Sequence, residues 1–362
     1  MKDDGRFMRT AIAVAERGRG TTSPNPLVGA LIVDADGITV GRGAHRMAGG
    51  PHAEVLALED AGGRARGATL YCTLEPCAHT GRTGPCAPLV ARAGIARAVI
   101  AIEDPNPLVN GAGLRYLRQH GVEVSVGIER DRAAEQNAVF LTNIRERRPY
   151  VILKAAVSAD GKLSAAAGAR TYLTSAAANR RIHRQRAEVD AIGVGSGTLL
   201  ADDPLLTARG AYRARPLTRV VFDRRLRTAA TARIMRTLEA GPVIIIGTKV
   251  SDTDSGKAAE ALIAAGANVL ELDDAGIVPA LHALMARGVM SILLEGGAAL
   301  HRAALDANVV DEVHLYIAPA VLGPGSVDWI GGGRLSWESL QKRRAEWLGE
   351  TVLVEGYVHR TG

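Results

Sequence analysis

The chain has 362 residues, of which 47% are hydrophobic and 23% are charged, a composition that excludes a wholly disordered protein. Its 44 basic and 38 acidic residues give a net charge of +6, which is compatible with phosphorylated small molecules as ligands. Because most of the basic residues are arginines and alanine is abundant, this charge does not by itself indicate a nucleic-acid surface. The length predicts two domains or three.

Three cysteines, Cys72, Cys77 and Cys86, lie close together in the first half of the chain. They are too few for a disulfide framework, so we interpret them as metal ligands or reactive thiols in a reducing compartment. The N-terminal segment is interrupted by charges, which is not typical of a signal peptide, and no apolar run approaches the roughly 20 residues of a membrane helix. We therefore expect a soluble, cytoplasmic protein with no membrane partner.

In the first half, the hydrophobic pattern predicts alternating helices and strands. Apolar residues at helical spacing indicate a helix over 7–15, and Asp36-Gly37 provides the turn of a β-hairpin. Pro149 disfavours a helical residue before it, so we place a domain boundary near residues 145–149. The other expected elements are helices over 53–61, 87–93 and from about 131 to the boundary, and strands over 68–74, 98–104 and 122–128.

The second half contains short, continuous apolar runs, which are typical of buried central strands. Helical stretches separate several of these runs, so we expect a largely parallel sheet that is covered on both faces, an α/β fold. A closing strand over 351–359 is expected to be antiparallel. The apolar runs span 150–158, 190–195, 219–223, 242–247, 291–297 and 312–319, and the helical stretches span 174–187, 257–266 and 278–288.

The most specific chemical pattern consists of His52, Glu54, Cys77 and Cys86. One imidazole and two thiolates make three ligands for zinc, and a catalytic zinc keeps its fourth position open for water. Glu54, near a helix start, is placed to carry protons between that water and a leaving amine. A His-x-Glu followed by Pro-Cys and a second Cys is the known pattern of zinc nucleobase deaminases, although eight residues instead of two separate these cysteines.

The alternative interpretation is that these four are unrelated surface and loop residues. The segment TLEPC and the second cysteine follow in the predicted strand–helix order, which disfavours it. Cys72 lies inside the predicted strand, and we interpret it as a small buried residue.

Two segments of the second half bear on ligand binding. In SILLEGGAALHRAAL a strand ends at Glu295, and Gly296 and Gly297 precede a helix whose free N–H groups can attract an anion. A strand–helix turn without a ligand explains the same pattern, and neither GxGxxG nor a P-loop motif occurs. Residues 209–236 contain nine arginines against one acidic residue, Asp223, and we interpret this cluster as a solvated face or loop.

The first 145 residues resemble the deaminase half of the bifunctional riboflavin-biosynthesis deaminase–reductases, on the segments SPNPLVGA, GRGAH, GGPHAEVLAL, TLEPCAHTGRTGPC and EDPNP. The loop AHTGRTGP between the cysteines is characteristic of that family. The resemblance implies a cytidine-deaminase-like α/β/α domain over 1–146, with one zinc ion held by His52, Cys77 and Cys86, and with Glu54 as the catalytic proton carrier. It also implies that the pyrimidine substrate is bound by Asn25, His45, His79, Thr80 and Arg82. From the residues alone, Asn25 would be a turn residue and His45 a surface histidine.

Residues 150 to about 325 resemble the reductase half of the same family, on the segments VILKAAVSADGK, YLTS, VGSGTLLADDPLLTAR, LLEGG and IAPAVLG. The resemblance implies a dihydrofolate-reductase-like α/β domain over 150–362 that uses NADPH, with Lys154 and Asp202 near the hydride-transfer centre. The implied NADPH-binding residues are Ala156, Tyr172, Thr198, Asp202, Gly297, Ala298, Ala299, Leu300, His301, Arg302 and Ala303. The implied substrate-binding residues are Lys154, Arg170, Arg186, Leu206, Arg209 and Glu295.

Together these resemblances imply two consecutive reactions. The first domain would hydrolyse the ring amine of 2,5-diamino-6-ribosylamino-4(3H)-pyrimidinone 5′-phosphate. The second would reduce 5-amino-6-(5-phosphoribosylamino)uracil to the ribitylamino phosphate. We expect a homo-oligomer, a dimer or tetramer, without a nucleic-acid partner.

Two alternatives come from other classes of protein. A tRNA-editing deaminase would need aromatic stacking platforms, but aromatic residues are only 4% of the chain. A structural zinc protein would need a fourth protein ligand, for which His79 is the nearby candidate.

Overall fold

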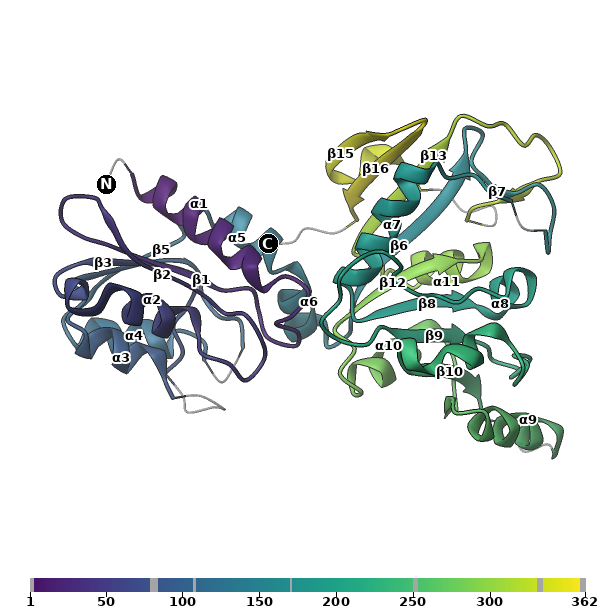
Figure 1. Ribbon diagram of the computed structural model, residues 1–362, viewed down its shortest axis with the longest axis horizontal. Helices are drawn as coiled ribbons and strands as arrows, with labels where there is room; N and C mark the ends of the chain where they lie inside the picture. Colours follow the sequence, from purple (N-terminus) through teal and green to yellow (C-terminus); the bar gives the residue numbers. More distant parts are fainter. Residues whose placement is uncertain are drawn as a thin grey trace. The chain divides into compact units, whose positions relative to one another are not determined.

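The computed structural model describes residues 3–78, 84–106, 109–169, 171–249, 253–330 and 335–358 (Figure 1). It divides the chain into two compact units, with the break between Glu146 and Arg147. Within the described ranges, every helix is too short or too polar to cross a membrane.

A five-stranded sheet forms the centre of the first unit, in the order β2-β1-β3-β4-β5. Its strands are β1 (Gly29–Val33), β2 (Thr39–Ala44), β3 (Thr69–Leu74), β4 (Arg97–Ile102) and β5 (Glu123–Val126). β1 pairs antiparallel with β2 and β3, whereas β3, β4 and β5 run parallel. The pairing of β1 with β2 is the hairpin that the Asp36-Gly37 turn predicts.

Helices cover both faces of this sheet. They are α1 (Asp4–Ala15), α2 (Ala53–Ala61), α3 (Cys86–Arg92), α4 (Ala112–Gln119), α5 (Arg130–Gln136) and α6 (Ala138–Glu146). Gly29 of β1 lies against α1, whereas Gly43 of β2, which pairs with Ala30, lies against α2. Because side chains alternate along a strand, α1 and α2 pack on opposite faces, as Figure 1 also shows. The expected α/β/α arrangement of this unit is confirmed.

The second unit is built on a nine-stranded sheet in the order β11-β10-β9-β8-β12-β6-β13-β16-β15. The strands from β11 to β13 in this order are parallel, and β16 and β15 extend the sheet antiparallel. This confirms the largely parallel α/β sheet and the antiparallel closing strand. The strands are β6 (Tyr150–Ser158), β8 (Ala191–Gly195), β9 (Thr218–Phe222), β10 (Val243–Thr248), β11 (Asn268–Leu272), β12 (Ser291–Gly296), β13 (Glu312–Ala318), β15 (Gln341–Leu348) and β16 (Thr351–Tyr357).

Apolar side chains bury both faces of this sheet. Along β12, Ile292 and Leu294 belong to one apolar cluster and Leu293 belongs to another, so successive residues face opposite layers. The helices are α7 (Ala176–Glu188), α8 (Ser196–Asp202), α9 (Thr253–Ala264), α10 (Ile277–Met285) and α11 (Ala298–Asp306). A separate two-stranded ladder joins β7 (Lys162–Ser164) to β14 (Val327–Asp328).

One expected helix is interrupted in the structure, and β15 is a strand that the sequence analysis did not expect. The helix predicted from about 131 onward is interrupted at Asn137, whose φ of −103° and ψ of 20° are not helical. The side-chain amide of Asn137 bonds both main-chain groups of Leu27 and so ties this break to the loop before β1. The strand β15 has no apolar alternation, since its first seven residues are exposed at the edge of the sheet, and the hydrophobic pattern does not predict it.

Candidate active sites

His52, Cys77 and Cys86 form a compact ligand cluster in the first unit. His52 immediately precedes α2, Cys86 begins α3, and Cys77 follows β3 by three residues. The Nδ1 atom of His52 lies 3.6 Å from the sulfur of Cys77 and 3.2 Å from that of Cys86, and the three ligand atoms lie within 4.8 Å of one another. Zinc bonds of about 2.0–2.3 Å can reach all three atoms from one centre.

The donor chemistry of the cluster also suits zinc. The thiol of Cys86 and the imidazole of His52 lower the pKa of Cys77, against the opposing effect of burial. The main-chain N–H of Cys86 lies 3.4 Å from the Cys77 sulfur and donates to it. These contacts favour the thiolate form of Cys77, which is the form that binds metal. The residues present fit a zinc ion with one open position.

Glu54 lies in the first turn of α2, next to this cluster. Its side chain is almost completely buried, and burial raises its pKa to about 7. A raised pKa brings protonation of Glu54 closer to neutral pH, which suits a group that accepts a proton and later returns it.

Two glycines of β2 determine where α2 begins. A Cβ atom on Gly43 would lie 2.0 Å from the carbonyl oxygen of Ala53, and one on Gly41 would lie 2.2 Å from that of Ala57. Any larger residue would push the helix away from the strand. The segment GRGAH thus lets main chain pack on main chain, and this contact positions His52 and Glu54 at the start of α2.

Asn25 and His45 form a hydrogen-bonded chain beside the cluster. Nδ1 of His45 lies 3.0 Å from the carbonyl oxygen of Pro51 and donates to it, so Nε2 accepts from the Asn25 amide at 3.0 Å. Burial lowers the pKa of His45, which favours this neutral form. The rings of His45 and His52 meet edge to face, with centroids 5.5 Å apart. The substrate-binding role of Asn25 and His45 stays a prediction, and His79, Thr80 and Arg82 lie outside the described residues.

The sequence gives no role to Glu75, which the structure shows to be a buried organising group. Its carboxylate accepts from the main-chain N–H groups of Asp104 at 3.2 Å, Gly111 at 3.0 Å and Gly113 at 2.9 Å. It thereby fixes the start of α4 and the preceding loop beside the end of β3, two residues from Cys77. The sequence signal that could have revealed this role is an acidic residue directly after the apolar strand β3.

A cleft of about 860 Å³ opens in the second unit across β9, β8, β12 and β6. The predicted NADPH-binding residues that line it are Ala156, Thr198, Asp202, Gly297, Ala298, Ala299, Leu300 and Ala303. Three others are outside this lining: Tyr172 is 80% exposed, His301 is fully buried, and Arg302 pairs with Asp306 at 2.6 Å. Arg170 lies outside the described residues, and the cofactor-binding roles stay predictions.

Lys154 and Glu295 lie on the wall of this cleft and join Arg186 in a buried ionic group. Arg186 donates to both oxygens of Glu295, at 2.6 and 2.7 Å, and Lys154 Nζ lies 3.8 Å from Glu295. Burial raises the pKa of Glu295, but the two cations outweigh it and hold the pKa at about 2. Burial lowers the pKa of Lys154. This part of the cleft therefore presents one ionised carboxylate fixed by two cations.

Two other predicted substrate residues, Leu206 and Arg209, lie outside the lining of the cleft. Leu206 is buried with a positive φ of 52°, and Arg209 lies beside His183, with Nη2 3.4 Å from Nε2 of the ring. Their contact with substrate stays a prediction.

Gly297 forms the turn between β12 and α11. Its φ of +87° suits glycine, and a Cβ atom there would lie 3.2 Å from Oγ1 of Thr198. The turn leads into the first N–H groups of the nine-residue α11 at the cleft. These groups fit a phosphate of a dinucleotide cofactor.

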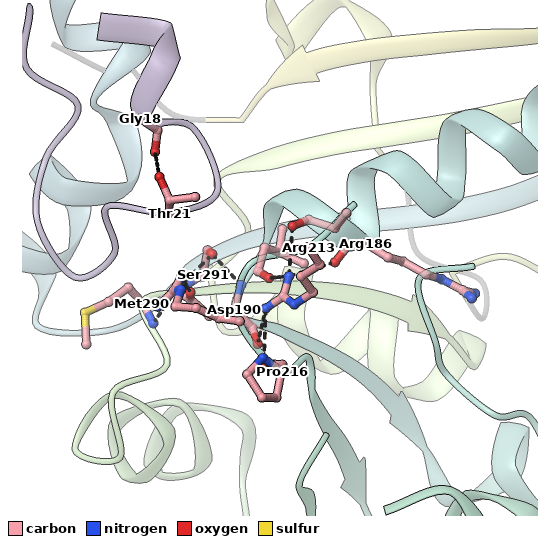
Figure 2. A network of polar contacts seen from close by, with 11 residues as sticks. Gly18, Thr21, Arg186, Asp190, Arg213, Pro216, Met290 and Ser291 are labelled. Atoms are coloured by element: carbon pink, nitrogen blue, oxygen red, sulfur yellow. Dashed lines mark hydrogen bonds and ion pairs between the residues drawn. The ribbon is translucent and has the colours of Figure 1, made fainter. Parts of the chain in front are cut away.

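The arginine cluster is not a uniform solvated face, which is a correction to its interpretation from sequence. Figure 2 shows Arg213, which donates to the carbonyl oxygens of Arg186 and Ala187 at 3.2 and 2.9 Å. The figure also shows Asp190 accepting from the N–H groups of Met290 and Ser291, and Arg215 pairs with the same carboxylate at 2.5 Å.

Arg219 departs furthest from that interpretation. Its side chain is fully buried and donates to Thr237 Oγ1 at 2.7 Å and to the Thr237 carbonyl at 2.8 Å. Main-chain carbonyl groups can satisfy a guanidinium as acidic partners do, and sequence patterns do not show such bonds.

Two family models match the chain. The model of the RibD C-terminal domain matches residues 149–354, and the model described as the cytidine and deoxycytidylate deaminase zinc-binding region matches residues 1–102. The riboflavin biosynthesis protein RibD of Aquifex aeolicus is 39% identical over 97% of this chain and 97% of its own length. The chain belongs to the RibD family. RibD of Acinetobacter baumannii has a TM-score of 0.86 with 36% identity, over 98% of this chain and 99% of its own.

A solved structure from Thermotoga maritima is named a diaminohydroxyphosphoribosylaminopyrimidine deaminase/5-amino-6-(5-phosphoribosylamino)uracil reductase. It has a TM-score of 0.83 with 32% identity and covers 98% of each chain. As a RibD protein the chain is a bifunctional enzyme of riboflavin biosynthesis, with a cytidine-deaminase-like zinc domain and a dihydrofolate-reductase-like domain that uses NADPH. The tRNA-editing and structural-zinc alternatives are set aside.

Proposed function

We propose that the first unit deaminates 2,5-diamino-6-ribosylamino-4(3H)-pyrimidinone 5′-phosphate and that the second reduces 5-amino-6-(5-phosphoribosylamino)uracil with NADPH. The observation that carries this proposal is the His52, Cys77 and Cys86 cluster beside a buried Glu54, in a chain whose other unit contains an extended cleft. The name of the Thermotoga maritima relative supplies the two substrates.

In the deaminase unit, Glu54 transfers the protons. A zinc ion held by the three ligands supplies a Lewis acid that makes water nucleophilic near neutral pH. The Glu54 carboxylate accepts the proton that the attacking water loses, and its protonated form then donates to the departing amine, so that ammonia leaves. Asn25 and His45 bind the pyrimidine beside it, with His45 held as the neutral tautomer by Pro51. His79, Thr80 and Arg82 complete this substrate-binding set.

In the reductase unit, the chain contributes binding and orientation. NADPH supplies the hydride. Glu295, kept ionised by Arg186 and Lys154, accepts hydrogen bonds from hydroxyl groups of the ring-opened ribose. The substrate set also includes Arg170, Leu206 and Arg209, and Asp202 lies near the hydride-transfer centre. The cofactor set is the one that the sequence predicts, including Tyr172, His301 and Arg302.

We also assign the enzyme to the cytoplasm as a homo-oligomer, a dimer or tetramer. Support for the compartment comes from Cys72, Cys77 and Cys86, which form no disulfide in this structure; Cys77 and Cys86 belong to the zinc site. Light scattering of the purified protein measures the assembly, and a monomer at micromolar concentration contradicts it.

Incubation of the purified, zinc-loaded protein with the diaminopyrimidine substrate tests the function. Without NADPH we expect ammonia and the deaminated phosphoribosylaminouracil only. With NADPH we expect the ribitylamino phosphate and one NADP⁺ per molecule of product. Release of ammonia without reduction of either pyrimidine when NADPH is present contradicts the assignment of the second unit.

A further inference from the structure

The ammonium group of Lys154 has only a distant partner in the ionic group of the cleft. Its Nζ atom lies 3.8 Å from Glu295, beyond the length of a hydrogen bond, whereas Arg186 donates to both oxygens of that carboxylate at 2.6 and 2.7 Å. The side chain of Lys154 is 9% exposed, so water solvates it poorly. A buried cation in this setting needs a further contact to keep its charge and its place.

The aromatic ring of Tyr316 supplies this further contact. The Nζ atom of Lys154 lies over the ring, 5.6 Å from its centroid, and the negative face of an aromatic ring attracts a cation at this distance. The strand register explains why the two meet. β6 and β13 are parallel neighbours in which Lys154 pairs with His314 and Ala156 pairs with Tyr316. Because side chains two positions apart share a face of the sheet, Lys154 and Tyr316 lie on the same face.

The ring of Tyr316 has a fixed position. The residue is fully buried and belongs to an apolar cluster with Ile182 of α7 and Leu353 of β16. Its hydroxyl group donates to Oε1 of Gln185 at 2.7 Å. Tyr316 is absent from the lining of the cleft, so its effect on a bound substrate passes through Lys154.

The side-chain amide of Gln185 is itself oriented by a chain of hydrogen bonds. Its Nε2 atom lies 2.7 Å from Nδ1 of His314 and 3.4 Å from the carboxylate of Glu355. Because a carboxylate only accepts, the amide nitrogen faces Glu355, and Nδ1 of His314 accepts as well. Nε2 of His314 then donates to Glu312 at 2.8 Å. The amide oxygen of Gln185 is left to accept from the Tyr316 hydroxyl.

One turn of α7 supports both partners of Lys154. Gln185 and Arg186 are consecutive residues of this helix. Gln185 holds the hydroxyl of Tyr316, and Arg186 holds the carboxylate of Glu295. The ring and the carboxylate are therefore fixed relative to each other by the same helical turn.

The charge on Lys154 depends on groups from four elements. The titratable groups around it are Glu295 on β12, Arg186 on α7, His301 on α11 and Tyr316 on β13. Burial lowers the pKa of Lys154, Glu295 raises it and Arg186 lowers it. Burial also lowers the pKa of His301, to about 4, and raises that of Tyr316, so both rings are neutral near pH 7. A ring face that favours the cation opposes the effect of burial on Lys154.

We propose that Tyr316 is a positioning residue for the reductase reaction, and that its ring holds the Lys154 ammonium charged and in place beside Glu295. This inference rests on the proposed function of the second unit, in which Lys154 belongs to the substrate-binding set. From the position that the ring defines, the ammonium can donate hydrogen bonds to oxygen atoms of the ring-opened ribose.

The electrostatic effect of the ring can be changed while its shape stays nearly constant. In the full-length protein, Tyr316→Phe is compared with mono-, di- and trifluorophenylalanine at the same position, because each fluorine weakens the negative face of the ring. The measurement is kcat/KM for the NADPH-dependent reduction of the deaminated substrate, as a function of pH. This ratio reports the pKa values of essential groups in the free enzyme.

The basic limb of this profile should move to lower pH with each added fluorine. We expect a shift of about half a pH unit or more over the series, since the ring favours the charged form of Lys154. The affinity for NADPH, measured by fluorescence titration, should stay at the value of Tyr316→Phe throughout. Retained NADPH binding shows that the cleft is folded in each variant.

Leu353→Ala is the matched control for a general loosening of the core. Leu353 is fully buried, belongs to the same apolar cluster as Tyr316 and pairs with it between β13 and β16. The variant should lower the unfolding temperature and leave the basic limb at the wild-type pH, since the ring and Lys154 both remain.

The outcomes separate this inference from the function on which it rests. A wild-type protein that neither binds NADPH nor reduces the deaminated substrate contradicts the proposed function of the second unit. A wild-type profile without a basic limb, or a limb that stays in place across the fluorinated series, leaves that function intact and shows the inference to be wrong. A shift in Leu353→Ala as large as that of the trifluorinated variant also shows it to be wrong.

Discussion

The two sites of this enzyme differ in their exposure to solvent. In the first unit Cys86 is fully buried and Glu54 is 3% exposed, and both lie in the first turn of a helix. The second unit has a long cleft whose wall includes the 50% exposed side chain of Arg227. A compact site acts on one atom through a few indispensable groups, whereas a cleft binds an extended molecule through many contacts. Single changes should therefore abolish function in the first site and weaken binding by degrees in the second.

The largest effect is expected from the zinc ligands. Cys86→Ser should lose zinc and deamination together, because a serine hydroxyl at neutral pH does not replace a thiolate ligand. Metal analysis of the purified variant measures the loss. Cys72→Ser is the control, since burial keeps Cys72 a neutral thiol inside β3, and it should retain one zinc per chain. Loss of zinc from Cys72→Ser but not from Cys86→Ser would reverse the ligand assignment.

Glu54→Gln should come next, with deamination reduced by at least about 10²-fold. The amide has similar size but cannot accept and return a proton, so zinc content should stay at the wild-type level. Reduction of separately supplied deaminated substrate should be unchanged, because its site belongs to the other unit. Normal ammonia release by a zinc-loaded Glu54→Gln protein is incompatible with the proton-transfer role.

In the cleft, Gly297→Asp should weaken NADPH binding by about tenfold or more, because it places a negative charge where we expect a phosphate. Gly297→Ala separates charge from backbone strain, since both variants meet the positive φ but only one carries a charge. Fluorescence titration of both variants measures the difference. Equal affinities for NADPH would mean that the phosphates bind elsewhere.

The smallest effect concerns acid stability. The folded pKa of Glu295, about 2, is below its ordinary value of 4.5, so the carboxylate contributes stability above pH 4.5 that is lost as the pH falls toward 2. The unfolding temperature of the second unit should fall over this range, and Glu295→Gln should flatten that fall. Calorimetry of both proteins from pH 5 to pH 2 provides the comparison. Identical pH profiles would show that Glu295 does not contribute to the acid sensitivity.

The zinc site was open to prediction from sequence because its signal is local. His52 and Glu54 share one helix start, and Cys77 and Cys86 flank a single loop, so residue spacing and residue type together specify the chemistry. The α/β architecture was predictable for a similar reason, since buried parallel strands require continuous apolar runs. The family resemblance carried the assignments of Asn25 and His45, which spacing alone does not distinguish from a turn residue and a surface residue.

Other features depend on contacts between distant residues. Arg219 and Arg224 look alike in sequence, but Arg219 lies on β9 and is buried on main-chain carbonyls, whereas Arg224 lies in the turn after β9 and lines a cleft. The bonds of Glu75 to the start of α4 join residues more than thirty positions apart. Hydrophobic periodicity contains no information on such polar pairings.

The contact between β2 and α2 limits which amino-acid substitutions are compatible with the position of α2. At Gly41 and Gly43 the helix rests on main-chain atoms, which have no alternative rotamers and lose no side-chain entropy on folding. A conventional apolar interface can repack when one residue changes size, but this one has nothing to rearrange. A single methyl group added at either glycine would therefore displace the start of α2, and with it both His52 and Glu54.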